Sequence, residues 1–263
     1  MINNIELEEF IKEKINTNND EIFSIDFQEK KYWVKKARET KSSITHMVFY
    51  KFFSFDILLP VQYKNAQESI EHETSKIRRF QSLGLSMPDI VFQDKNYFAL
   101  EDCGKTVNSY IRKRDITKDK MYYFINKVIN ELSKIHNFNE YHGGAQCRNF
   151  TYKDGKVSII DLEDSFSQDT DIKTLQFRDF ILFLLSLTKT RASFELDYNI
   201  IIKQYIMLSN NHDFINRLRK LANKISFLIK LSEIKFINNL LGSDIKSFFR
   251  LFKILKSLDI SYE

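Results

Sequence analysis

Three polar residues near the middle of the chain have a spacing that could support phosphate chemistry. His142 and Asn149 lie in the segment HGGAQCRN, and Asp161 ends the apolar segment VSIID twelve residues after Asn149. The intervening sequence TYKDGKVSIID has the pattern of a β-hairpin with KDGK at its turn. Such a hairpin would bring Asn149 and Asp161 side by side. A pair of side-chain oxygens of this kind suits Mg²⁺, which would then hold nucleotide phosphates.

The elements on either side of this segment are expected to be mostly helical. A long helix is predicted over residues 118–137, directly before His142, because its apolar residues recur three or four positions apart. After the hairpin, helices are predicted over 175–190 and 194–209, with further amphipathic helices to about residue 258. The residues of the predicted buried stripe of the long helix are Met121, Ile125, Val128, Leu132 and Ile135.

The first hundred residues have a mixed pattern. A helix is predicted over residues 4–16, with Ile5, Phe10 and Ile11 on or near one face. Alternating apolar residues then predict a β-hairpin. The remaining predictions are strands at 22–27 and 32–37, a helix at 67–83 that Gly84 stops, two strands within the segment MPDIVFQDKNYFALEDCG, and a short helix at 106–112.

The order of these segments resembles the protein-kinase-like fold in its atypical bacterial branch. That branch includes aminoglycoside phosphotransferases, lipopolysaccharide core kinases and the small kinase of the KEOPS complex. Their catalytic loop reads H-G-D-x-x-x-x-N, followed by a hairpin and I-D; this chain has HGGAQCRN and then Ile160-Asp161. A bacterial subgroup similar to the KEOPS kinase, with the loop HGGAQ-x-RN, is the nearest resemblance. The likeness extends over roughly residues 20–195.

The resemblance implies an α+β, bilobal fold. A small β-rich N-lobe would span residues 1–103, and a larger, mainly helical C-lobe would span 104–263. The catalytic loop would be 141–150 and the metal-binding hairpin 151–164.

The resemblance also assigns the residues of an ATP and Mg²⁺ site. Lys35 would contact the α- and β-phosphates, with Lys36 as an alternative. Glu73 would pair with that lysine, with Glu71 and Glu68 as weaker alternatives.

Further roles follow from the same resemblance. The strand and hinge ending in Glu101, Asp102 and Cys103 would hold adenine through backbone hydrogen bonds. Asn149 and Asp161 would bind the metal. Asp179 would tie down the catalytic loop, and His142 is expected to pack that loop rather than to act in catalysis.

Two departures from the family pattern bear on activity. Gly144 stands where the family has the aspartate that accepts the proton of the acceptor hydroxyl. Loss of a general base costs typically 10²–10⁴ in rate, and Glu163 or Asp164 could substitute. No glycine precedes Gly84, so a glycine-rich phosphate loop is absent. The candidate catalytic residues are Asp161, Asn149, Glu163 and Asp164.

Two functions remain open from these residues. The first is an ATP- and Mg²⁺-dependent phosphotransferase that acts on a hydroxyl of a sugar, a lipid-linked sugar or a protein. The second is a pseudokinase that binds nucleotide or a partner without phosphoryl transfer, because of Gly144.

Composition narrows the class of protein. The chain has 263 residues, 43% of them hydrophobic, with 6 Gly and 2 Pro, which excludes collagen-like and disordered classes. Its two cysteines, Cys103 and Cys147, form no CxxC pattern, so neither a disulfide framework nor a zinc site is expected. A reducing, cytoplasmic compartment is the simple interpretation. No stretch of 18 apolar residues predicts a membrane span.

Charge and aromatic residues leave one further question open. Residues 203–256 hold 11 Lys or Arg against 3 Asp or Glu, within a chain of net charge +5. Residues 44–59 are densely apolar and predict either a core helix of the N-lobe or an interfacial helix at the inner face of a membrane. Together with the segment 248–258, they make an anionic membrane surface a candidate partner. A non-enzymatic module that binds lipid or nucleic acid explains less, and no nucleic-acid motif is present.

Overall fold

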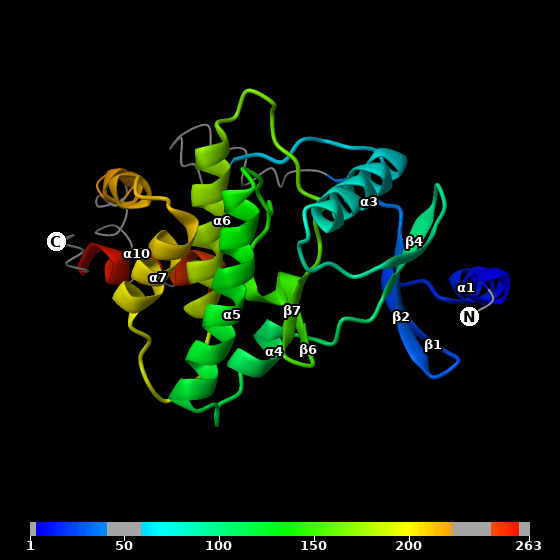
Figure 1. Cartoon of the computed structure of the whole chain (residues 1–263), viewed down its shortest axis with the longest axis horizontal. Coiled ribbons are helices and arrows are strands. Elements are labelled where there is room, and N and C mark those ends of the chain that lie inside the picture. The colour runs from blue at the N-terminus through cyan, green and yellow to red at the C-terminus, as the bar shows by residue number, and fades with distance from the viewer. Residues whose placement is uncertain (1–3, 41–58, 222, 224–242, 258–263) are drawn as a thin grey trace.

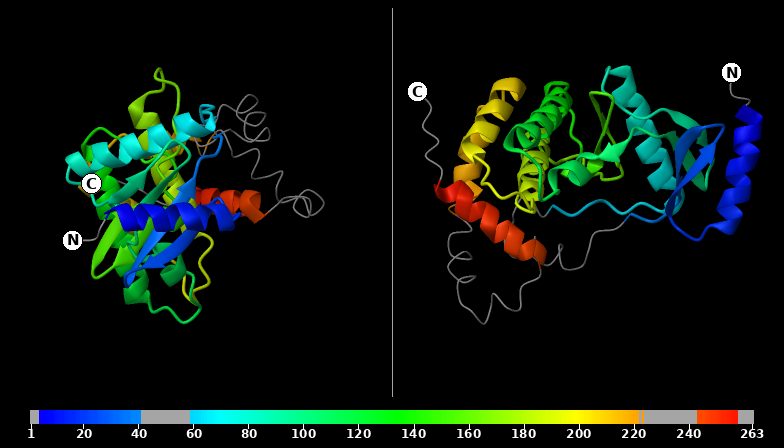
Figure 2. Two further views of the ribbon diagram at one scale, coloured as in Figure 1. Left: turned by 90° about the vertical axis from the view of Figure 1, so that its right-hand side faces the viewer. Right: turned by 90° about the horizontal axis from the view of Figure 1, so that it is seen from below.

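The protein has a β-rich N-terminal part followed by a mainly helical part (Figure 1). The computed structural model describes residues 4–40, 59–221, 223 and 243–257. In Figure 2 the first helix and the C-terminal helix lie at opposite ends of the long axis, with the first sheet next to the first helix. The predicted α+β arrangement is confirmed, whereas the division after residue 103 stays a prediction.

An antiparallel sheet in the order β1-β2-β4-β3 forms the N-terminal part. Alternate residues of the first two strands are buried, which gives the sheet one apolar face. Helix α1 (Asn4–Thr17) covers that face (Figure 2). The opposite face carries Lys35. The strands are β1 (Ile22–Phe27), β2 (Lys30–Lys36), β3 (Ile90–Gln93) and β4 (Tyr97–Glu101).

Helix α1 forms as predicted but turns a different face to the sheet. Leu7 and Ile11, four residues apart, are buried, whereas Ile5 is 66% exposed. Residues two apart lie on different sides of a helix. The prediction for Ile5 was therefore wrong, because the pair Leu7 and Ile11 sets the contact with the sheet.

The turn between β1 and β2 has only two residues. Gln28 and Glu29 have φ angles of 48° and 62°, the left-handed pair that a tight hairpin turn requires. Glycine or asparagine usually fills these positions. Because the turn is so short and holds no glycine, it provides no extended loop of the kind that wraps phosphates.

Helix α3 (Ala66–Ser82) connects the sheet to the helical part. Its N-terminus has a capping box, in which Asn65 and Glu68 bond each other's backbone N–H groups. Ile77 and Phe80 are buried in the large core, while Glu73 is buried on the side facing β2.

A small second sheet in the order β5-β6-β7 holds the predicted hairpin, and the predicted stripe of α5 is fully buried. Helix α6 begins three residues earlier than predicted, because Asp171 caps it through the backbone N–H groups of Lys173 and Thr174. Helix α7 begins four residues later than predicted, where Asp197 forms the cap. The elements are β5 (Lys105–Thr106), α4 (Val107–Ile111), α5 (Lys118–Asn137), η2 (Cys147–Asn149), β6 (Phe150–Lys153), β7 (Lys156–Ile159), α6 (Ile172–Leu187) and α7 (Tyr198–Ser209).

The last described helix, α10 (Ser243–Ser257), packs on α6. Its apolar side chains Leu251, Phe252 and Leu255 are buried in the core and are therefore not free to enter a membrane. Apart from its last residue, the segment predicted as an apolar helix at 44–59 lies outside the described residues. In the described part of the chain, no helix has the length and apolar character needed to cross a membrane.

Candidate active site

Lys35 is the centre of a cluster of charged side chains from three parts of the chain. Its Nζ lies 2.7 Å from Glu73 Oε2, 3.1 Å from Asp161 Oδ1 and 3.0 Å from Glu163 Oε2. Strand β2 supplies the lysine, α3 supplies Glu73, and the segment after β7 supplies the other two acids. The structure thus brings together four of the predicted site residues.

Burial and charge act in opposite directions on this cluster. Burial alone would lower the pKa of Lys35, but attraction to Glu73, Asp161 and Glu163 outweighs it and raises that pKa above its usual value. Burial raises the pKa of Glu73, and Lys35 only partly opposes this. For Asp161 burial is outweighed by Lys35, so its pKa is lowered. Lys35 is therefore a charged lysine, with a side chain only 12% exposed.

Arg38 extends the cluster and was missed in the sequence. Its Nη2 lies 2.8 Å from Glu163 Oε1 and 3.0 Å from Glu163 Oε2, and its Nη1 lies 2.9 Å from Glu21. Both carboxylate oxygens of Glu163 thus contact cations, Arg38 and Lys35. From sequence, a basic residue just after a strand is expected to be exposed to solvent. The contact with Glu163 is visible only in the folded chain.

The structure separates Lys35 and Glu73 from their alternatives. Lys36 points to the other side of β2, where its Nζ donates to the carbonyls of Ile15 and Asn18 at the end of α1. Glu68 belongs to the capping box of α3. Glu71 accepts a hydrogen bond from Gln67 on the outer side of the helix.

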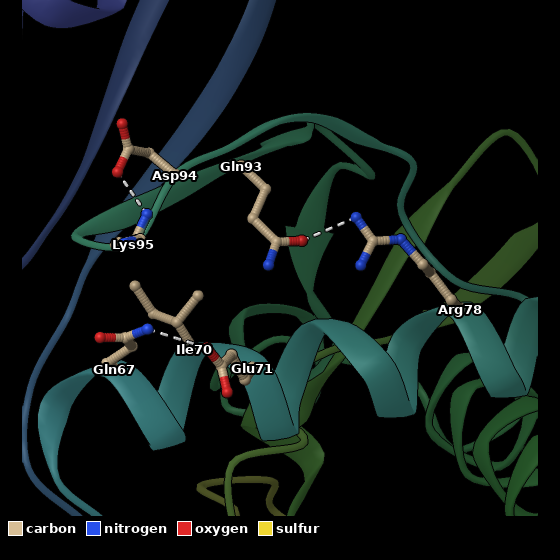
Figure 3. A pocket seen from close by; sticks show the side chains of 7 residues that line it. All are labelled: Gln67, Ile70, Glu71, Arg78, Gln93, Asp94 and Lys95. Carbon is tan, nitrogen blue, oxygen red and sulfur yellow. Dashed lines mark hydrogen bonds between the residues drawn. The ribbon is translucent and has the colours of Figure 1, made fainter.

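The outer side of α3 borders a different hollow, shown in Figure 3. This pocket has a volume of about 490 Å³ and lies between α3 and the β3–β4 turn. Its polar groups largely bond one another: Arg78 donates to Gln93 at 2.7 Å, and Gln67 donates to Glu71 at 3.0 Å. None of the residues of the Lys35 cluster lines it. The residues that do are Gln67, Ile70, Glu71, Arg78, Gln93, Asp94 and Lys95.

Asp179 of α6 holds the loop that precedes η2. Its carboxylate accepts the backbone N–H groups of His142 at 2.6 Å and Gly143 at 2.9 Å. Arg178 donates to the carbonyl of Gly143. Burial would raise the pKa of Asp179, but contact with His136 and neighbouring groups lowers it instead. The prediction that Asp179 ties down this loop is confirmed, and the fully buried His142 packs within it.

Lys76 links α3 to the same loop and was also missed. Its Nζ donates to the carbonyl of His142 at 2.9 Å and lies 4.1 Å from the ring centre of Tyr141. Burial lowers its pKa to about 8. Its position three residues after Glu73 places both side chains on one side of α3. The three-residue spacing from Glu73 could have indicated that Lys76 is near the site, but a lysine in a helix is usually solvent-exposed.

Asn149 and Asp161 lie at the open end of the β6–β7 hairpin. The backbone N–H of Ile160 donates to the carbonyl of Asn149 at 3.0 Å, which brings the two predicted ligands to adjacent positions. Asn149 uses its side-chain nitrogen to donate to the carbonyl of Gly144 at 2.8 Å, which leaves its side-chain oxygen for another group. Asp161 has a φ of 63°, a left-handed conformation that aspartate tolerates.

Comparison with solved structures indicates which fold the chain has. The chain is 13% identical to WaaP, solved in complex with acyl carrier protein, with a TM-score of 0.50 over 84% of this chain and 90% of WaaP. It has a protein-kinase-like fold. No known protein-family model matches. In sequence the chain is 23% identical over 259 residues to an uncharacterized protein of Haemophilus influenzae, covering 97% of this chain and 98% of that protein.

Two aminoglycoside phosphotransferases are also similar in structure, at lower scores. APH(2'')-Ib with ADP bound has a TM-score of 0.41 and 12% identity, over 95% of this chain and 97% of that one. The ternary complex of streptomycin, ATP and APH(2'')-IIa has a TM-score of 0.43 and 10% identity, over 94% and 97%.

In the kinase-like fold, the segment after β4 corresponds to the predicted hinge. The backbone N–H of Glu101 donates to Asp89 at 3.0 Å, and that of Asp102 donates to Lys31 at 3.1 Å. Among the described residues, none accepts the N–H of Cys103. Of the three predicted hinge residues, Cys103 therefore keeps a backbone donor for a ligand.

A close approach fixes the predicted hinge segment against β6. Gly104 has a φ of +87°, and a Cβ there would lie 2.4 Å from the carbonyl oxygen of Tyr152. Only glycine fits such a position. The side chain of Asp102 reinforces the bend by accepting the N–H of Gly104 at 3.1 Å and the indole N–H of Trp33 at 2.8 Å.

The two glycines of the kinase-like loop differ. Gly143 has a φ of +103°, and a Cβ there would lie 2.9 Å from Cβ of Asp164, so glycine is required. At Gly144 a Cβ would lie 3.3 Å from Asn149 Nδ2 and 3.7 Å from Asp164 Oδ2. A side chain at position 144 would thus enter the space between Asn149 and Asp164.

Proposed function

We propose that this protein is an ATP- and Mg²⁺-dependent phosphotransferase that transfers the γ-phosphoryl group of ATP to a hydroxyl of a sugar, a lipid-linked sugar or a protein. The observation that carries the proposal is the nearly buried Lys35, held between Glu73 of α3 and Asp161 after the hairpin. A lysine fixed in this way between two elements of a kinase-like fold is suited to bind phosphates.

The charges around Lys35 fit a divalent cation. Glu73, Asp161 and Glu163 all contact Lys35, and Glu163 also contacts Arg38, so three carboxylates meet two cations. No group of three or more His, Cys, Asp or Glu suited to a metal exists in the described part of the chain. Mg²⁺ needs no such group, because it is commonly held by one or two protein ligands plus phosphates and water.

Asp161 and the side-chain oxygen of Asn149 are the residues that would hold Mg²⁺. When bound, the ion would neutralise charge on the phosphates of ATP. The surplus negative charge of the cluster would favour it. Because Asn149 is fixed through its side-chain nitrogen to Gly144, its oxygen would keep one orientation.

The hinge would hold the adenine ring. Glu101, Asp102 and Cys103 are the proposed contacts, and the free backbone N–H of Cys103 would be the donor to a ring nitrogen. With adenine at the hinge and phosphates at Lys35, the triphosphate would extend toward Asn149 and Asp161.

The alternative is a pseudokinase. Gly144 favours it, because the loop has no aspartate at the position where the family has its proton acceptor. Such a protein would bind nucleotide through the same residues, or would bind only a partner, and would form no ADP. A nucleotide-binding pseudokinase therefore differs from the phosphotransferase in turnover alone, and a partner-binding one differs in nucleotide binding as well.

An anionic membrane surface remains a proposed partner, with a cytoplasmic protein peripheral at the inner face of the membrane. On α10 the exposed Lys256 would face such a surface, since the apolar side of that helix is packed on the core. Co-sedimentation with anionic liposomes at low salt tests this contact. Absence of co-sedimentation would overturn it.

The function is tested by calorimetry with ATP, with and without Mg²⁺, and by ADP formation in the same samples. We expect binding that requires Mg²⁺ and is lost in Asp161→Asn. The matched control is Asp154→Asn, at the hairpin turn, which also has a left-handed backbone with a φ of 49°. No binding by the wild type would overturn the phosphotransferase and leave only a pseudokinase that acts through a partner. Binding without ADP formation would leave the pseudokinase.

A further inference from the structure

The space next to Gly144 is bordered by a carboxylate from elsewhere in the chain. A Cβ on Gly144 would lie 3.7 Å from Asp164 Oδ2, an ordinary contact distance. Asp164 comes this close because Gly143 has no side chain, since a Cβ there would lie 2.9 Å from Cβ of Asp164. The carboxylate of Asp164 thus lies beside the position from which an aspartate at 144 would extend.

The three acids after β7 differ in what they contact. Asp161 is bonded to Lys35, and both oxygens of Glu163 contact Lys35 or Arg38. In the described residues, no hydrogen bond or ion pair within 4.0 Å involves the carboxylate of Asp164. Its side chain is half-buried. As far as contacts among the described residues go, Asp164 is therefore the one of these three acids whose carboxylate is left to accept a proton from a ligand.

We propose that Asp164 is the catalytic base of this protein and supplies from the end of the hairpin the carboxylate that Gly144 lacks. This inference rests on the proposed phosphotransferase function. As the acceptor oxygen forms its bond to the γ-phosphorus, Asp164 Oδ2 takes the hydroxyl proton. The bond between the γ-phosphorus and the bridging oxygen breaks, and ADP leaves with that electron pair.

The surroundings suit a base. Burial raises the pKa of Asp164, and attraction to Arg178 only partly opposes this, while Glu163 and Asp161 raise it further. Lys76, another nearby cation, is bonded to the loop carbonyl of His142. A carboxylate with a raised pKa binds a proton more readily than an exposed one.

The test removes the carboxylate at position 164 and places a new one at position 144, on the other side of the space between the two residues. Four variants are compared with the wild type: Asp164→Asn, Asp169→Asn, and Asp164→Asn combined with either Gly144→Asp or Gly144→Ala. The exposed Asp169 is the matched control for loss of one nearby acid. The Gly144→Ala pair controls for the added Cβ, which lies 3.3 Å from Asn149 Nδ2. The readouts are Mg²⁺–ATP affinity by calorimetry and ADP formation with water as acceptor.

We expect Asp164→Asn to lower ADP formation by about 100-fold or more with the Kd for Mg²⁺–ATP unchanged. Adding Gly144→Asp to Asp164→Asn should raise the rate of ADP formation at least tenfold above that of Asp164→Asn alone. Adding Gly144→Ala to Asp164→Asn should have little effect, and Asp169→Asn alone should leave the wild-type rate nearly unchanged. Unchanged ADP formation in Asp164→Asn would overturn the proposal. So would a parallel loss of Mg²⁺–ATP affinity, which would make Asp164 a metal ligand.

Failure of the proposed function looks different from failure of the base. If the wild type bound no Mg²⁺–ATP, the phosphotransferase itself would be wrong. If the wild type bound Mg²⁺–ATP and formed no ADP, phosphoryl transfer and the base would both be overturned, and nucleotide binding would stand. If only Asp164→Asn behaved as the wild type, the base alone would be wrong.

Discussion

The proposed phosphate side of the site, around Lys35, and its proposed acceptor side, around Gly144, differ in how many of the protein's own groups occupy them. On the proposed phosphate side, Lys35 contacts three carboxylates, and Arg38 also contacts one of them, Glu163. On the acceptor side, Gly144 has no side chain, and the described residues leave the Asp164 carboxylate unpaired. The first arrangement is ordered before any ligand arrives, and the second is open. The groups proposed to bind nucleotide are therefore in place independently of the group proposed to remove a proton.

The largest effect is expected from Lys35→Met, which breaks the phosphate side. ADP formation should fall to background. The free energy of unfolding at pH 7 should fall by about 3 kcal/mol, because buried carboxylates lose their cation. Lys35 has a raised pKa, so it is fully charged below the usual 10.5, and its stabilisation is fully present at pH 7. Urea unfolding of the wild type and Lys35→Met at pH 7.5 and 5 measures the difference in the free energy of unfolding.

The pH dependence of that variant has a definite sign. Without Lys35, Glu73, Asp161 and Glu163 repel one another, and protonation relieves the repulsion. The destabilisation of Lys35→Met should therefore shrink as the pH falls toward 5. Lys156→Met, on an exposed lysine of β7, is the control. A Lys35→Met protein with wild-type turnover would contradict the assignment of the phosphate side.

The phosphate side was the more predictable of the two from sequence. Lys35 and Glu73 lie in elements whose periodicity is strong, and the hairpin before Asp161 has a clear turn signal. Period-2 alternation places Lys35 on one face of β2, but the alternative Lys36 was resolved only by the position of α1. Alternation indicates which face a residue is on, and not which face is covered.

Other parts were not predictable, because they depend on contacts between distant segments. Arg38 meets Glu163 across 125 positions, and Lys76 meets His142 across 66. Charged residues in a helix or after a strand are usually exposed, so sequence alone favours a solvated role for both. Likewise, no local pattern indicates that Asp164 approaches Gly144, since that depends on the left-handed bend at Gly143.

A smaller effect is expected from Glu73→Gln, compared with Glu71→Gln two residues earlier. Glu73 is buried against Lys35, whereas Glu71 lies on the outer pocket. Glu73→Gln removes one of three carboxylates from Lys35, so turnover should fall about tenfold, equivalent to about 1.4 kcal/mol. Glu71→Gln should leave turnover unchanged. The rate of steady-state ADP formation measures both effects. Equal effects of the two changes would mean that the contact of Lys35 with Glu73 of α3 does not contribute to turnover.

Lys76→Met tests the link between the two sides. Burial lowers the pKa of Lys76 to about 8 from the usual 10.5. Between these pH values the unfolded chain binds a proton that the folded protein releases, so wild-type stability should gain from rising pH. The variant should lack this gain, and its turnover should fall about threefold as α3 loses its bond to His142.

Urea unfolding from pH 7 to 10 measures the difference between the wild type and Lys76→Met. The groups around Lys76 include Asp179, Asp164, Glu140 and Arg79, and the comparison of the two proteins cancels what they share. Parallel stability curves would contradict a buried, charged Lys76. The exposed Lys120 at the start of α5 gives a control variant, Lys120→Met, for a lysine that keeps its usual surroundings.

The smallest effect concerns the proposed hinge, where Mg²⁺–ATP at saturation should slow alkylation of Cys103 about twofold. The thiol of Cys103 is half-buried beside the free N–H, and burial raises its pKa, so the reaction is followed at pH 8.5. Cys147 is the internal control, because it is buried and its pKa is raised to about 12. Mass spectrometry separates the two sites. Equal rates with and without bound nucleotide would show that adenine lies elsewhere, and the phosphate side would then bind a ligand that does not contact the hinge.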